Sequence, residues 1–109
     1  MVNILLNGLC GKMGQEVLKE ASISFKDKCK IVCGVDKDFT IFPNLNVYND
    51  PYIITENPNV IIDFSVPKAT LKILEYAKEK NLPIVIATTR FFLRRIKNYW
   101  RIFKTYTYF

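Results

Sequence analysis

Three glycines near the N-terminus have a spacing that suits the binding of a phosphate group. They are Gly8, Gly11 and Gly14, which follow a short apolar run and precede an amphipathic stretch. A strand that ends in glycines and leads directly into a helix presents free backbone N–H groups to an anion. In such a loop Gly8 permits a tight turn, Gly11 lets the backbone approach a pyrophosphate, and Gly14 permits close packing of the helix on the strand.

The spacing G-x-x-G-x-x-G differs from the G-x-G-x-x-G of the usual dinucleotide fingerprint. Alone, it is equally compatible with a strand–helix turn that binds no ligand. Asp36 favours the binding interpretation, because it ends the apolar segment KIVCGVD. Dinucleotide-binding folds place the carboxylate that binds the ribose hydroxyls about 20 residues beyond the loop. The alternative is a surface acid at a strand end. Lys37, beside Asp36, would suit a 2′-phosphate.

The elements that position these residues alternate between strands and helices. Apolar runs typical of buried strands occur near 2–7, 30–36, 60–64 and 83–87, with a short candidate at 46–48. This alternation predicts an α/β fold with a parallel sheet. We expect the strand order 3-2-1-4 for the four main strands, or the same order with 46–48 added at an edge.

Helical periodicity predicts two main helices between these strands. The first continues from the glycine loop to Ile23, and the second begins at Val66-Pro67 and ends at Asn81. The second helix places Lys72 and Lys78 on its predicted solvent side. One further turn of helix is expected after Asp50.

Several candidate residues follow directly after predicted strands. The carboxyl ends of parallel strands share one edge of the sheet, where ligands of such folds bind. The glycine loop, Asp36, Phe64-Ser65 and 87–89 are therefore expected at one edge. This convergence favours nucleotide binding over a loop that binds nothing.

Composition restricts the class of protein. With 109 residues, half of them apolar, the chain suits a single folded domain and not a disordered protein. We find neither a signal peptide nor an apolar stretch of the ~18 residues that a membrane span needs. Cys10, Cys29 and Cys33 occur without any histidine. This pattern favours reduced core thiols over a metal site, and we expect a cytoplasmic protein without a metal.

The net charge of +6 arises entirely in the last 20 residues. Residues 1–89 contain ten Lys and ten Asp or Glu, which sum to zero, whereas residues 90–109 contain six basic residues and no acid. We therefore divide the chain into a dinucleotide-binding domain, 1–89, and a basic aromatic tail, 90–109.

Four segments together resemble the N-terminal domain of the dihydrodipicolinate reductases. They are NGLCGKMGQEV, GVDKD, NVIIDFSVPKATL and PIVIATT, and the resemblance covers 2–89, weakly so in 38–58. These enzymes are NADH- or NADPH-dependent oxidoreductases of bacterial lysine and diaminopimelate biosynthesis. The resemblance implies a Rossmann-like domain that is incomplete, because the family's substrate-binding domain is absent from this chain.

The resemblance also implies a set of cofactor-binding residues. The loop would hold the pyrophosphate, Asp36 the adenosine ribose and Lys37 a 2′-phosphate, while residues after the later strands would flank the nicotinamide. Ala87 stands where the family usually has glycine. The complete set is Gly8, Leu9, Cys10, Gly11, Lys12, Met13, Asp36, Lys37, Phe64, Ser65, Ala87, Thr88 and Thr89.

No catalytic residue can be carried over from the family. Its catalytic segment contains paired histidines and a lysine, and this chain has no histidine. We expect this fragment to be inactive alone and unable to form oligomers through the absent domain.

The tail departs from the family directly after Thr89, where Arg90 replaces the family's glycine. Back-translation with A/T-rich codons, read one base later, restores that glycine and gives an acidic amphipathic helix followed by a strand. This predicts a one-base frame shift near Thr89 and a tail without a selected role.

Two other interpretations of the chain stay open. In one, it is a small binding module whose basic aromatic tail, with Tyr99 and Trp100, contacts nucleic acid or an anionic membrane. The frame-shift prediction makes a nucleic-acid partner the less favoured choice. In the other, it is a poorly folded fragment with an exposed sheet edge that aggregates.

Overall fold

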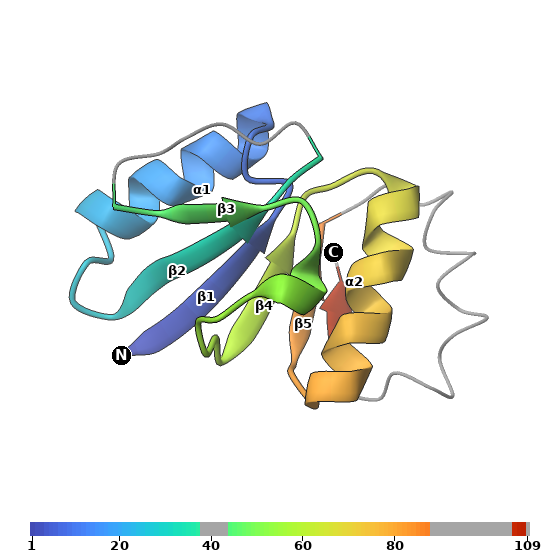
Figure 1. The fold of residues 1–109 in the computed structure, drawn as a ribbon. Helices are drawn as coiled ribbons and strands as arrows, with labels where there is room; N and C mark the ends of the chain where they lie inside the picture. The colour runs from blue at the N-terminus through green and yellow to red at the C-terminus, as the bar shows by residue number, and fades with distance from the viewer. Residues whose placement is uncertain (38–43, 88–105, 109) are drawn as a thin grey trace.

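The computed structural model describes residues 1–37, 44–87 and 106–108, and within them six strands form one parallel sheet. The strand order is β3-β2-β1-β4-β5-β6 (Figure 1). The strands are β1 (Val2–Asn7), β2 (Cys29–Val35), β3 (Asn46–Tyr48), β4 (Val60–Asp63), β5 (Ile84–Ile86) and β6 (Tyr106–Tyr108). Two α-helices, α1 (Lys12–Ile23) and α2 (Pro67–Lys80), and the short 3₁₀ helix η1 (Pro51–Ile53) connect them. The predicted α/β class and parallel sheet are confirmed.

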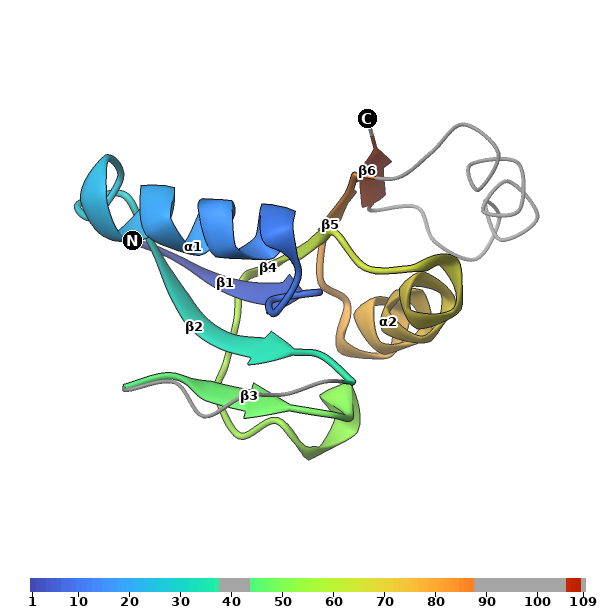
Figure 2. The same ribbon diagram turned by 90° about the horizontal axis from the view of Figure 1, so that it is seen from above.

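The two α-helices cover opposite faces of the sheet, as Figure 2 shows. Alternate residues of β1 pack on opposite faces of the sheet, because successive side chains of a strand point to opposite sides. Ile4 and Leu6 pack in the cluster that includes Ala21 of α1. Leu5 packs in the cluster that includes Leu74 of α2. Burial on both faces explains why Ile4, Leu5 and Leu6 form an unbroken apolar run within β1.

Both ends of α2 match the sequence prediction. Pro67 stands at the start of the helix, where the missing N–H of proline costs no hydrogen bond. Asn81 adopts a left-handed conformation with φ of 56° and donates its N–H to the carbonyl of Lys78, which ends the helix. The predicted turn after Asp50 is also confirmed, as η1.

The predicted order 3-2-1-4 of the four main strands is wrong, although the short strand β3 lies at an edge of the sheet, as expected. The prediction places 83–87 beside 2–7, whereas β5 pairs with β4. An order 3-2-1-4 of the four main strands would place 60–64 beside 30–36. The short strand β3 occupies that place instead, and β4 pairs in parallel with β1 on its other side. The chain therefore reverses its direction of progress across the sheet between β3 and β4. Such a reversal creates the crevice at which ligands of open α/β sheets bind.

A bulge interrupts the pairing of β2 with β1. Ile4 pairs with Ile31, but Leu5 pairs with Cys33, so Val32 has no partner in β1. The extra residue puts Ile31 in the α1-side cluster and Cys33 in the α2-side cluster, although they are two positions apart. Gly34 consequently lies under Leu9 on the α1 side.

Candidate nucleotide site

Gly8 closes the loop against the neighbouring strand ends. Its φ is +84°, and a Cβ atom here would lie 2.9 Å from the backbone carbon of Phe64 and from the backbone nitrogen of Ser65. Its own N–H donates a hydrogen bond of 2.8 Å to the carbonyl of Val35. Both the backbone conformation and the close approach therefore require glycine.

Gly14 and Gly11 differ in what surrounds them. A Cβ at Gly14, inside α1, would lie 2.3 Å from the carbonyl oxygen of Gly8 and 2.7 Å from that of Leu9. A Cβ at Gly11 would meet only the carbonyl oxygen of Gly8, at 3.5 Å, which is ordinary contact. The predicted packing role of Gly14 is thus visible in the structure, whereas the fold itself does not exclude a side chain at Gly11.

The N-terminus of α1 is open at this loop. Gly11 is the N-cap residue and supplies no side-chain hydrogen bond to the first turn. Gly11, Lys12 and Met13 are exposed. The Leu9 side chain is instead fully buried in the α1-side core, so only the backbone of Leu9 can face a ligand.

Asp36 reaches the loop from the end of β2. Its Oδ2 accepts a hydrogen bond of 3.0 Å from the backbone N–H of Cys10, which is half-buried. The structure thus brings the predicted ribose-binding carboxylate to the predicted phosphate loop. Lys37 follows it and is exposed.

A cavity of about 500 Å³ opens beside these residues, at the carboxyl ends of β1, β2 and β4. Six of the predicted residues line it: Gly8, Gly11, Asp36, Lys37, Phe64 and Ser65. Leu9, Cys10, Lys12, Met13 and Ala87 do not, and Thr88 and Thr89 lie outside the described residues. Sequence reasoning missed the remaining wall, which comprises Asn7, Val35, Asn49, Pro51, Val66, Lys68, Ala69, Lys72 and Ile73.

A buried carboxylate supports the floor of this site. Asp63 is fully buried at the end of β4, and Asn7, Ser65 and Thr70 all donate hydrogen bonds to its carboxylate. Burial raises the pKa of the Asp63 carboxyl above its ordinary value of 3.8, and these hydrogen bonds oppose part of that rise. A polar residue at the end of two buried strands, Asn7 and Asp63, is the sequence signal that would have revealed this network.

The network orders the turn that follows β4. The Ser65 N–H and Oγ both donate to Asp63, and the single Thr70 hydroxyl proton is also donated to that carboxylate. Asp63 therefore ties the 64–66 turn to the first turns of α2, two elements that line the cavity.

Within 1–37, 44–87 and 106–108, no three His, Cys, Asp or Glu side chains gather in a way that would hold a metal ion. The helices of those same ranges are too short or too polar to span a membrane.

The parallel sheet, the helices on both faces and the glycine loop at the carboxyl edge define a Rossmann-like α/β domain. Comparison with protein families identifies this domain further. The chain belongs to the family described as dihydrodipicolinate reductase, N-terminus, whose model matches residues 2–102.

Individual relatives agree with this assignment. The chain is 37% identical over 89 residues to a 4-hydroxy-tetrahydrodipicolinate reductase of Clostridium tetani, covering 82% of this chain and 34% of the relative. It thus spans about a third of the length of the curated relatives that it matches.

Solved structures share the fold. A dipicolinate-bound dihydrodipicolinate reductase from Paenisporosarcina sp. TG-14 superposes with a TM-score of 0.69 at 22% identity, covering 87% of this chain and 41% of that one. The WlbA dehydrogenase of Thermus thermophilus, in complex with NAD and UDP-GlcNAcA, gives a TM-score of 0.69 at 13% identity, covering 99% of this chain and 41% of that one.

Proposed function

We propose that this chain binds a nicotinamide dinucleotide, NADH or NADPH, as the N-terminal domain of a 4-hydroxy-tetrahydrodipicolinate reductase. The contrast among the loop glycines carries the proposal. The backbone of the chain itself leaves no room for a side chain at Gly8 or Gly14. Gly11 has that room and is exposed beside the cavity, so the close approach of a ligand gives a reason for glycine there.

The residues of the site fit the parts of such a cofactor. The backbone of 8–13 and the open first turn of α1 offer N–H groups to the pyrophosphate. Asp36 offers a carboxylate to the adenosine ribose, and Lys37 a cation to a 2′-phosphate. Phe64, Ser65 and 87–89 would flank the nicotinamide, which supplies a hydride when the reduced cofactor is bound.

We propose the activity of the whole reductase only for a longer protein that contains this domain. The match covers about a third of the length of the relatives, whose names describe a 4-hydroxy-tetrahydrodipicolinate reductase. We propose that this activity serves lysine and diaminopimelate biosynthesis. We propose that such a protein works in the cytoplasm. For the 109-residue chain alone we expect no turnover, because it contains none of the histidines that the family's catalytic segment carries.

Titration of the purified chain with NADH tests the proposal. Because a site that a second domain does not close must be ordered on binding, we expect weak affinity, with a dissociation constant of order 0.1–1 mM, or about −4 to −5.5 kcal/mol. Absence of any binding at several millimolar NADH would contradict the proposal. Salt-dependent DNA binding that disappears on deletion of 90–109 would favour the binding-module alternative instead.

A further inference from the structure

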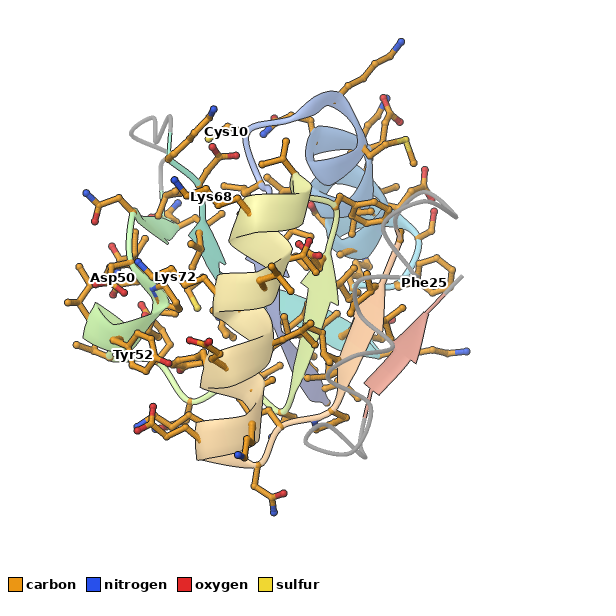
Figure 3. The ribbon with its side chains drawn as sticks, turned by 90° about the vertical axis from the view of Figure 1, so that its right-hand side faces the viewer. Cys10, Phe25, Asp50, Tyr52, Lys68 and Lys72 are labelled. Atoms are coloured by element: carbon orange, nitrogen blue, oxygen red, sulfur yellow. The ribbon has the colours of Figure 1, made fainter. Side chains whose placement is uncertain are left out.

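The cavity wall is more basic than a site for a plain ribose requires. Its charged residues are Asp36, Lys37, Lys68 and Lys72, which give a net charge of +2 from three lysines and one aspartate. Lys68 and Lys72 lie one turn apart on α2 and extend from the same side of that helix, toward the segment that carries Asp50 (Figure 3). Two of the three cations thus come from an element that the proposed cofactor contacts do not use.

Lys68 occupies a position where a cation destabilises a helix. It lies in the first turn of α2, at the positive end of the helix dipole. That turn contains no acidic residue, and its N-cap, Val66, supplies no side-chain hydrogen bond. Across the ranges that the structure describes, no ion pair involves Lys68. An uncompensated cation and open helix N–H groups therefore border the same cavity.

Lys72 differs from Lys68 because it already has an anionic partner. Its Nζ lies 3.7 Å from Oδ1 of Asp50. That carboxylate also accepts a hydrogen bond of 3.0 Å from the N–H of Tyr52 and so caps η1. Lys72 adds positive potential at the rim, whereas Lys68 has its charge available to a ligand.

The 2′-phosphate, which NADPH carries and NADH does not, has a proposed partner in Lys37 but none on α2. A phosphate on the adenosine ribose carries about −1.5 to −2 charge at neutral pH, and Asp36 alone would repel it. We infer that the cavity prefers the 2′-phosphorylated cofactor, NADPH, to NADH, with Lys68 of α2 contacting the 2′-phosphate in addition to Lys37. This inference rests on the proposed function, since it places the adenosine ribose at Asp36.

The test compares both cofactors on four forms of the full 109-residue chain at low ionic strength. The forms are the parent, Lys68→Met, Lys68→Arg and Lys78→Met; the last removes the same charge from the final turn of α2. We expect the parent to bind NADPH more tightly than NADH. Lys68→Met should weaken NADPH binding by roughly three- to fivefold, and leave NADH binding within about twofold. Lys68→Arg and Lys78→Met should keep the preference, and added salt should reduce it.

Thermal unfolding of the free chain supplies a second readout. Removing a cation from the first turn of α2 should raise the melting temperature of Lys68→Met by roughly 1–5 °C. A variant that is more stable yet loses NADPH affinity has not lost it by unfolding. A fall in melting temperature together with equal weakening of both cofactors would overturn the inference.

The outcomes separate the two proposals. NADH binding without any NADPH preference, or a preference that Lys68→Met leaves intact, overturns the role of Lys68 and leaves the proposed function standing. An equal loss in Lys78→Met would show a general charge effect and would also overturn it. If neither cofactor binds the parent, both proposals are wrong.

Discussion

The carboxylate of Asp36 accepts a hydrogen bond of 3.0 Å from the backbone N–H of Cys10, which lies 26 positions earlier in the chain. This bond joins the end of β2 to the middle of the glycine loop. The residue proposed to bind the ribose therefore also restrains the backbone proposed to bind the pyrophosphate. Its replacement should affect the two cofactors unequally.

Replacement of Asp36 by alanine is expected to weaken NADH binding about tenfold and NADPH binding about threefold or less. Both cofactors lose the ordered loop, but only NADH loses a charged acceptor for its free 2′-hydroxyl. Calorimetric titration with each cofactor measures the difference. Asp27→Ala, which removes an exposed acid elsewhere, serves as the control and should change neither affinity. Equal weakening of the two cofactors by Asp36→Ala would place the ribose elsewhere.

Replacement of Gly11 by valine is expected to abolish cofactor binding while the chain stays folded. The new side chain would project where the pyrophosphate must lie, yet its Cβ would meet only the Gly8 carbonyl oxygen, at 3.5 Å. Loss of glycine at a helix N-cap costs up to about 1 kcal/mol of unfolding free energy. Titration measures the loss of cofactor binding, and a melting curve on the same sample shows whether the chain stays folded. Binding as tight as that of the parent chain would remove the cofactor from this loop.

Replacement of Gly14 by alanine should differ from Gly11→Val, because it should lower the stability of the fold itself. Its Cβ would lie 2.3 Å and 2.7 Å from two carbonyl oxygens of the loop, so α1 must move away from the end of β1. We expect a loss of roughly 3 kcal/mol or more in unfolding free energy, in the range of overpacked or strained sites. Urea unfolding measures it, with Gly11→Ala as the matched glycine control. A Gly14→Ala protein as stable as Gly11→Ala would contradict this account of the packing.

The buried carboxyl of Asp63 predicts a dependence of stability on pH. Because burial raises its pKa in the folded chain above 3.8, the folded state holds this proton more tightly than the unfolded state does. Its contribution to stability is fully present below pH 3.8 and is lost as the pH rises through the raised value. We expect the unfolding free energy of the parent, relative to Asp63→Asn, to fall over that interval. Denaturant unfolding at a series of pH values tests this, and a parallel pair of curves would refute it.

The division of the chain at Thr89 also stays a prediction. The family model matches as far as residue 102, and 106–108 form β6 in parallel beside β5. The expected finding is a one-base change of frame near codon 89, with coding for a glycine and an acidic helix in the neighbouring frame. The nucleotide sequence of the gene decides, and a single open frame without such neighbouring coding would disprove it.

Local signals predicted most of the fold. The strand–glycine turn–helix unit, the strand-like apolar runs and the Pro67 and Asn81 helix ends are properties of neighbouring residues, and the structure contains each of them. The assignment of cofactor contacts to the loop stays a prediction. The order of the sheet was harder, because it depends on where β3 pairs, and three residues carry little sequence signal. The wall formed by α2 was missed for a similar reason. Periodicity assigns Lys72 to the solvent side of its helix, but it cannot show that a cavity lies there.

The bulge in β2 has a consequence for changes in chain length. Side chains alternate along a strand, so an inserted or deleted residue normally turns everything after it to the other face. Val32 stands outside the ladder with β1, and its removal would leave Ile31 opposite Ile4 and Cys33 opposite Leu5. β2 thus contains one residue that its pairing with β1 does not need. A shortened strand could absorb the deletion there and still direct Asp36 toward the glycine loop.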